Sequence, residues 1–208
     1  MVRPLVVILA LALGGCAAIG LANREPLQIL QLTPKSTYTP GLPNLDGMPL
    51  QIEVPSAAAG LNTSRIALKP TPTTLEYYAG ATWIEVLPVM LQTLVIESFD
   101  NTDSVDASDR LTMGGRARFA LALHVREFQP EYGGDTTSAP TINIRLQARL
   151  LSLPRRDEVA RASFETLELA TGTSLETIVL STDDALGATL KDLVLWTIDV
   201  MAERSPRV

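Results

Sequence analysis

Cysteine and histidine are nearly missing from this sequence, which has one of each among its 208 residues. A single thiol excludes a disulfide within the chain and, with a single imidazole, leaves no Cys/His set for a zinc site. The chain also lacks a GxxxxGKS/T phosphate loop, an HExxH zinc motif and a GxSxG nucleophile motif. His124 lies between two apolar residues of an alternating segment, so we interpret it as structural. We therefore expect no catalytic residue, no cofactor and no metal.

Positive charge is also scarce, because 17 lysines and arginines stand against 23 aspartates and glutamates and the formal net charge is −6. A domain that binds nucleic acid normally carries a basic surface, so we expect no nucleic-acid partner. Hydrophobic residues make up 46% of the chain, which is enough to fill the core of one domain of this length. Packing alone has to stabilise that core, since disulfides are excluded.

The apolar run near the N-terminus is short, with nine residues from Leu5 to Leu13. A transmembrane helix needs about 20 such residues, so we do not expect this run to span a bilayer. Arg3 precedes the run and two glycines follow it, which is the pattern of a secretory signal peptide. We expect a signal peptide over residues 1–15, which processing removes.

The only cysteine follows directly, in the sequence LGGC at residues 13–16. This sequence resembles a lipobox, in which the cysteine thiol of a bacterial lipoprotein receives a diacylglycerol before a peptidase cleaves on its N-terminal side. The resemblance implies lipidation at Cys16 and a lipidated tether over residues 16–26, ahead of a single domain over residues 27–208. Ala17 stands where an aspartate would mark inner-membrane retention, which implies an anchor at the periplasmic face of the outer membrane.

Alternating apolar and polar residues predict about six strands, at 27–33, 50–55, 65–70, 118–128, 141–153 and 158–169. The first is expected at an edge, followed by an extended arm, with Leu27 and Ile29 on one face. In the second, Leu50, Ile52 and Val54 share a face. The last three are joined by turns at residues 131–140 and 153–158, which predicts antiparallel neighbours with one buried face.

Two segments have the periodicity of amphipathic helices. In residues 84–98 apolar residues recur at three- and four-residue steps, and Pro88 is tolerated near the first turn. Residues 99–110 are expected to form an acidic loop. A second helix is predicted over residues 181–205, with Ser181 and Asp184 close to a capping box at its start. Its inward residues are expected to be Leu186, Leu190, Leu193, Val194, Thr197 and Met201. Two helices and about six strands predict an α/β sandwich with a mixed sheet.

Two groups of residues are candidate contacts with a partner. Four arginines lie on the polar side of their strands and would line up as a basic face if the strands pair: Arg118, Arg126, Arg145 and Arg149. A solvated sheet surface is the simpler explanation, and a docking face for an acidic partner or lipid headgroups is the alternative. Three aromatic residues lie between a predicted strand and a predicted helix: Tyr77, Tyr78 and Trp83. Core packing and a protein interface both explain them.

The region around these aromatics resembles a known family. A strand ending in Lys-Pro leads to YYAGATW, residues 77–83, and then to a predicted helix, as in the signature region of the ABC-type transport auxiliary lipoprotein family. The segments LNTSRIAL, TINIRLQARLLSLP and DDALGATLKDLVLW add to the resemblance, which covers nearly the whole chain. It implies an α/β domain of the anticodon-binding-like class.

The resemblance implies a non-catalytic periplasmic lipoprotein that assists an MCE-type ABC transporter in moving lipids or other hydrophobic molecules between membranes. The implied partners are an MCE-domain protein, the permease and the ATPase subunit, and the N-terminal lipid would hold the protein at a membrane. Assembly into a homo-oligomer is left open. Two other functions also remain open, a lipid- or solute-binding lipoprotein with its own apolar pocket between helices and sheet, and an unrelated envelope hydrolase.

Replacing the thiol tests the lipidation. We expect Cys16→Ser to prevent acylation, because a hydroxyl does not replace the thiol as acceptor, and to move the protein out of the membrane fraction. Intact mass spectrometry and membrane fractionation of both proteins measure this. An unacylated mature N-terminus in the wild-type protein would contradict the prediction.

Overall fold

The computed structural model describes residues 26–109, 112 and 116–204. The predicted signal peptide, Cys16 and the tether up to residue 25 lie outside the described residues. Three long strands dominate the sheet: β7 (Phe119–Glu131), β8 (Thr141–Ser152) and β9 (Asp157–Leu169). They are antiparallel neighbours with β8 in the middle, where Leu146 pairs with Val125 of β7 and with Phe164 of β9. The predicted order and direction of these strands are therefore confirmed.

Shorter strands extend the sheet beyond β7. Three of them, β2 (Leu50–Ile52), β3 (Ser56–Ala57) and β4 (Arg65–Thr71), pair with β7 in parallel, and β6 (Ala107–Ser108) pairs with β2. Strand β5 (Thr74–Trp83) forms an antiparallel hairpin with β4, and β1 (Gln28–Leu30) lies parallel to β5 at the edge. The nine strands of the described chain make a mixed sheet, as predicted.

The pattern of residues 74–83 does not predict β5, although this strand is ten residues long. The segment pairs with β4, with Tyr77 opposite Ala67. Gly80 has a φ of 71°, and the register with β4 shifts between Arg65 and Ala67. Such irregularities interrupt the alternation by which a strand is recognised in a sequence. The YYAGATW segment is therefore part of the sheet, not a link between strand and helix.

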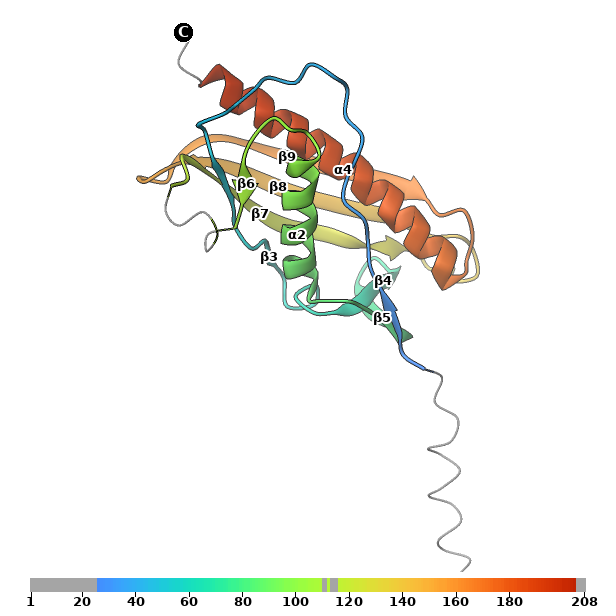
Figure 1. Cartoon of the computed structure of the whole chain (residues 1–208). Helices are drawn as coiled ribbons and strands as arrows, with labels where there is room; N and C mark the ends of the chain where they lie inside the picture. The colour runs from blue at the N-terminus through green and yellow to red at the C-terminus, as the bar shows by residue number, and fades with distance from the viewer. Residues whose placement is uncertain (1–25, 110–111, 113–115, 205–208) are drawn as a thin grey trace, which may run out of the picture.

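Two helices of the described chain, α2 (Leu87–Asp100) and α4 (Leu175–Glu203), lie on one side of the sheet (Figure 1). Helix α4 packs along β8 and β9, and α2 packs against α4 and β2. The apolar face of β8 is almost completely buried beneath them, as predicted: Ile142, Ile144, Leu146, Ala148 and Leu150. All the residues predicted to face inward on α4 are fully buried. Side chains thus fill the space between the sheet and the helices.

Both helices begin at other residues than the sequence predicts. Helix α2 begins at Leu87, with Pro88 in its first turn, so that Ile84 precedes the helix and is half exposed. It also runs on to Asp100, which places Phe99 in the core and not in the expected acidic loop. Helix α4 begins much earlier than predicted, at Leu175.

The N-terminal cap of α4 is Ser174, not Ser181. The Ser174 hydroxyl accepts a hydrogen bond from the Thr177 amide, as an N-cap does. Ser181 is buried inside the helix, where its hydroxyl accepts a hydrogen bond from the amide of Thr171. In a sequence, a serine followed by acidic residues resembles an N-cap even when it lies inside a helix. The buried stripe of α4 continues through Ile178, which shows that the helix starts before Ser181.

The predicted edge strand and extended arm are present at the N-terminal side of the domain. After β1 the chain passes over the helical layer before it reaches β2 (Figure 1). Leu32 and Leu45 of this arm are buried. The Asp183 carboxylate of α4 accepts hydrogen bonds from both the amide and the hydroxyl of Thr33, each at 2.7 Å. The Ser98 hydroxyl of α2 accepts a hydrogen bond from the Lys35 amide at 3.0 Å, and the Asn101 side chain just after α2 donates to the Lys35 carbonyl at 3.0 Å, so both helices hold the arm.

The faces predicted for the first two strands need correction. Leu27 and Ile29 are 60% and 64% exposed, because β1 is an edge strand that turns these side chains away from the core. Val54 is 55% exposed although Leu50 and Ile52 are fully buried. β2 ends at Ile52, so the alternation does not continue to Val54.

The arm contact at Asp183 gives a stability prediction. Asp183→Ala is expected to lower the free energy of unfolding by about 1–2 kcal/mol, because it removes two charge-assisted hydrogen bonds to Thr33. Asp184→Ala is the matched control, since the neighbouring carboxylate is exposed and forms no hydrogen bond or ion pair with a described residue, so its loss should change stability by less than about 0.5 kcal/mol. Urea unfolding of the three proteins measures the difference, and equal effects of both variants would contradict it.

Candidate functional site

The described residues leave one side of the sheet uncovered. Because α2 and α4 both pack on the same side, the opposite side of β7, β8 and β9 presents its side chains outward, and we call it the open face. Its residues come from every second position of the strands. On β8 they are Thr141, Asn143, Arg145, Gln147 and Arg149, and on β9 Arg161, Ser163, Glu165, Leu167 and Leu169. The β7 residues paired with them include Ala122, His124, Glu127 and Glu131.

An ionic network occupies the middle of the open face. Glu127 accepts hydrogen bonds from Lys69 of β4 at 2.8 Å and from Arg145 of β8 at 2.9 Å. Lys69 also lies 3.3 Å from Glu131, and Arg145 lies 3.8 Å from Glu165 of β9. The network joins four strands. Sequence reasoning singled out Arg145 but missed the acids, whose signal is the hairpin pairing that places Glu127 opposite Arg145.

The network shifts the pKa values of its members. Burial by itself would raise the pKa of Glu127, but the hydrogen bonds from Lys69, Gln129 and Arg145 and the charge of Lys69 outweigh it, so the pKa lies below its ordinary 4.5. Burial would lower the pKa of Lys69, and the bonds and charges of Glu127 and Glu131 outweigh it in turn, so that pKa is raised. The charged forms therefore stabilise the fold at neutral pH.

Two other predicted arginines border a cavity at one end of the open face. Arg126 and Arg149 line a space of about 520 Å³, whose other lining residues are Glu53, Val54, Ser56, Ala122, Leu123, His124 and Gln147. We call it the cationic cavity. Neither arginine forms an ion pair with a described residue. The expected basic face is therefore divided, since Arg145 is neutralised by its acids while Arg126 and Arg149 share a cavity. Arg118 lies just before β7, exposed.

The cavity also holds the single histidine. The Nδ1 atom of His124 lies 2.9 Å from the Ser56 hydroxyl oxygen. Glu53, which borders the same cavity, forms a two-pronged ion pair with Arg156 at 2.6 and 3.2 Å. Among the described residues no carboxylate is hydrogen-bonded to His124, so the arrangement does not match a Ser-His-acid triad.

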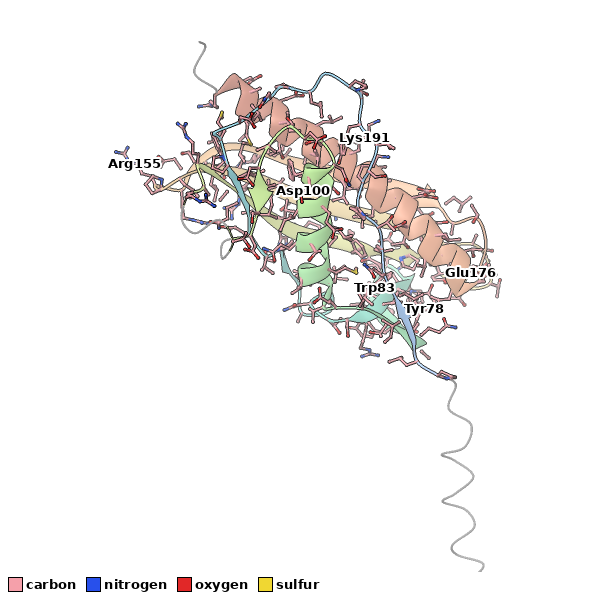
Figure 2. All side chains as sticks on the ribbon, in the orientation of Figure 1. Tyr78, Trp83, Asp100, Arg155, Glu176 and Lys191 are labelled. Carbon is pink, nitrogen blue, oxygen red and sulfur yellow. The ribbon has the colours of Figure 1, made fainter. Side chains whose placement is uncertain are left out.

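The three aromatic residues of β5 differ in burial. Trp83 is 4% exposed and packs edge-on against Phe128 with ring centroids 6.4 Å apart, which favours core packing for this residue. Figure 2 shows Trp83 and Tyr78 on the β4–β5 hairpin. Both tyrosines are half-buried. The Tyr77 hydroxyl donates to the Gly60 carbonyl at 3.0 Å, and the Arg65 guanidinium lies 3.7 Å above its ring.

Tyr78 is held by a second tyrosine. Its hydroxyl lies 2.7 Å from that of Tyr132, at the end of β7. Burial, then this hydrogen bond and the charge of Tyr132, raise the pKa of Tyr78 above its ordinary value. The phenol therefore stays neutral and ties the hairpin to the long strands.

Two further properties concern the described residues alone. Their His, Cys, Asp and Glu side chains do not gather in any group of three that could hold a metal ion. None of the helices in this part of the chain has the length and hydropathy needed to cross a membrane.

Known proteins share this sequence pattern and this fold. The model of the family described as "ABC-type transport auxiliary lipoprotein component" matches residues 28–194, from β1 into α4. A crystal structure of a protein from Xanthomonas campestris has a TM-score of 0.76 at 28% identity, and the match covers 85% of this chain and 98% of that one. Another crystal structure, of an uncharacterised protein, has a TM-score of 0.60 at 11% identity, covers 86% and 99% of the two chains, and shows the fold alone.

A curated relative from Bradyrhizobium diazoefficiens, itself uncharacterised, is 29% identical over 149 residues. The match covers 72% of this chain and 39% of that protein, so the chain spans about two fifths of the relative's length.

The ionic network predicts loss of stability in acid. Since the pKa of Glu127 is lowered on folding, its contribution is complete above the ordinary pKa of 4.5 and is lost as the pH falls through the folded-state value. Glu127→Gln is expected to cost about 1–2 kcal/mol at pH 7 and to reduce the dependence of stability on pH below 5. Urea unfolding between about pH 3 and pH 7 measures both effects.

Glu165→Gln serves as the control for this experiment. Glu165 is 43% exposed and lies 3.8 Å from Arg145, so its loss should change stability by less than about 0.5 kcal/mol. Unchanged pH dependence in Glu127→Gln would show that the network does not stabilise the fold.

Proposed function

The chain belongs to the family of ABC-type transport auxiliary lipoproteins, and from this premise we propose that it is a non-catalytic component that docks an MCE-type ABC transporter at a membrane. In this proposal Cys16 carries the lipid anchor, and the domain lies on the periplasmic side of the envelope, held to the outer membrane. The transporter moves lipids or other hydrophobic molecules, and ATP is hydrolysed by its ATPase subunit. The observation that carries the proposal is the family match over residues 28–194, which covers almost the whole described domain.

The filled core supports docking over solute binding. A lipid-binding domain needs an apolar space that takes up an acyl chain. Here the layer between the sheet and the helices is closed by fully buried side chains, among them Leu121, Ile144, Leu150, Leu190 and Val194. A protein of this kind acts through its surface, which supports a role in recruiting other subunits.

The open face beside β9 is the surface that we propose for the MCE-domain protein. Within the described chain β9 pairs only with β8, so the outer edge of this 13-residue strand is free to bind another chain. Leu167 and Leu169 are 63% and 67% exposed on the adjoining face. Arg145 and Arg149 of β8 lie on the same face and would form the charged rim of the interface.

The β4–β5 hairpin is a second proposed contact. Tyr77 and Tyr78 are half-buried, and both hydroxyls have hydrogen-bond partners within the domain, so their rings are held in place for a partner. Trp83 would support this contact from the core, because it is too buried to reach another protein.

Co-purification tests the proposal. The tagged full chain is purified from detergent-solubilised envelopes, and bound proteins are identified by mass spectrometry. We expect the MCE-domain protein, the permease and the ATPase subunit to be recovered. The variant L167D/L169D should reduce recovery at least about tenfold, because buried leucines at an interface core contribute on the order of 1–2 kcal/mol each.

The control is Leu180→Asp, which changes a 59% exposed leucine on α4, on the other side of the sheet. It should leave recovery unchanged. Recovery of bound lipid and no transporter subunit from the wild-type chain would refute the proposal in favour of a lipid-binding protein.

A further inference from the structure

The cationic cavity differs from its surroundings in how its charges are compensated. Four lysine and arginine side chains around it have acidic partners: Lys69 and Arg145 bind Glu127, Arg156 binds Glu53, and Arg161 lies 2.6 Å from Glu158. Arg126 and Arg149 have no such partner among the described residues, in a protein whose net charge is −6. Two uncompensated guanidinium groups therefore border one concave space.

Strand pairing adds a third guanidinium close by. Arg149 of β8 lies directly opposite Arg161 of β9 in the antiparallel register. Like charges at opposite positions of a sheet destabilise it. Glu158 compensates Arg161 at 2.6 Å, so Arg149 is the member of this pair that has no acidic partner among the described residues.

The cavity also presents hydrogen-bond donors from several strands. Arg126 donates through Nε to the Gln147 side chain at 2.9 Å, which orients its guanidinium and leaves the two terminal nitrogens without a described partner. His124 is engaged through Nδ1 with Ser56, whose hydroxyl also donates to the Leu123 carbonyl at 3.3 Å, so the imidazole is not counted among these donors. Glu53 does not compete for Arg126 and Arg149, because both its oxygens bind Arg156. Strands β7 and β8 hold these donors on a rigid sheet.

We propose that the cationic cavity binds a phosphate group. The tetrahedral phosphate offers several acceptor oxygens and can engage two guanidinium groups at once, whereas a single arginine can occupy both oxygens of a carboxylate. The space of about 520 Å³ is in the range of small-ligand sites, which measure about 300–1,000 Å³, and is larger than one carboxylate side chain needs. The ligand is a free phosphate compound or the phosphate of a phospholipid headgroup.

Phosphate binding goes beyond the proposed recruiting function; Arg149 belongs to both surfaces, but the two functions are measured separately. Binding is a property of the isolated protein, whereas recruitment is measured by recovery of transporter subunits. A protein that binds phosphate without recovering subunits refutes only the recruiting function, and the reverse result refutes only the cavity.

Two probes test the proposal with the full chain in a nonionic detergent. Inorganic phosphate and dihexanoyl phosphatidylglycerol are titrated separately, and the ³¹P NMR line width and calorimetry report binding. Arg126→Gln and Arg149→Gln are each expected to weaken binding about tenfold or more, because each removes charge-assisted hydrogen bonds. Lys191→Gln is the charge-matched control, since Lys191 lies on α4 on the helical side of the molecule (Figure 2) and should leave binding unchanged.

The outcomes separate the sources of the phosphate. Binding of both probes that depends on the two arginines supports recognition of the phosphate group itself. If only the phospholipid binds and its binding depends on the arginines, the site is assigned to a headgroup. If only inorganic phosphate binds in this way, the site is assigned to a small phosphate compound. Binding of neither probe, or binding that Lys191→Gln weakens as much as the arginine variants do, would overturn the proposal.

Thermal unfolding at low ionic strength distinguishes a binding role from a structural one. Without phosphate, Arg149→Gln should leave the Tm nearly unchanged, because Arg149 has no ion pair with a described residue to lose. Phosphate should raise the Tm of the wild-type protein and not that of the variant. A Tm lowered in both arginine variants would assign these residues to the structure and refute the binding site.

Discussion

The contact between the apolar side of β8 and the inward face of α4 is the constraint on which the rest of the structure depends. Five alternate residues of β8 and the buried stripe of α4 are withdrawn from water together, and neither surface is stable exposed. Because α2 and the N-terminal arm pack on the same side, all of the covering material lies on one side of the sheet. The opposite side is therefore left uncovered by the part of the chain that the structure describes.

The open face shows how a sheet without a second layer manages its charges. In its middle, Glu127 binds Lys69 and Arg145 and is kept ionised by them, which ties four strands together. At one end Arg126 and Arg149 remain uncompensated around a cavity, and at the other Leu167 and Leu169 are exposed. Compensated charge stabilises the fold, whereas uncompensated charge and exposed leucines are costs that a binding partner would offset. This contrast separates the structural part of the face from its proposed binding parts.

Much of the fold could be predicted because long elements with one buried face leave a regular pattern in the sequence. The alternation of residues 141–153 and the spacing from Leu186 to Met201 were sufficient for β8 and for the inward side of α4. β5 was missed because Gly80 and a register shift interrupt its alternation, and the start of α4 was misplaced because Ser181 imitates a cap. Local signals fail where tertiary contacts override them.

The sequence by itself determined the composition of the core, the antiparallel order of the three long strands and the family of the protein, since periodicity and motif are properties of neighbouring residues. Only the tertiary structure decided which charges are paired. Arg145 and Arg149 are equivalent in the sequence, both on the polar side of one strand. In the folded protein Arg145 lies against Glu127 from β7, while Arg149 faces Arg161 from β9. The pairing register of these successive strands sets that difference, because Coulomb interactions depend on distance in space.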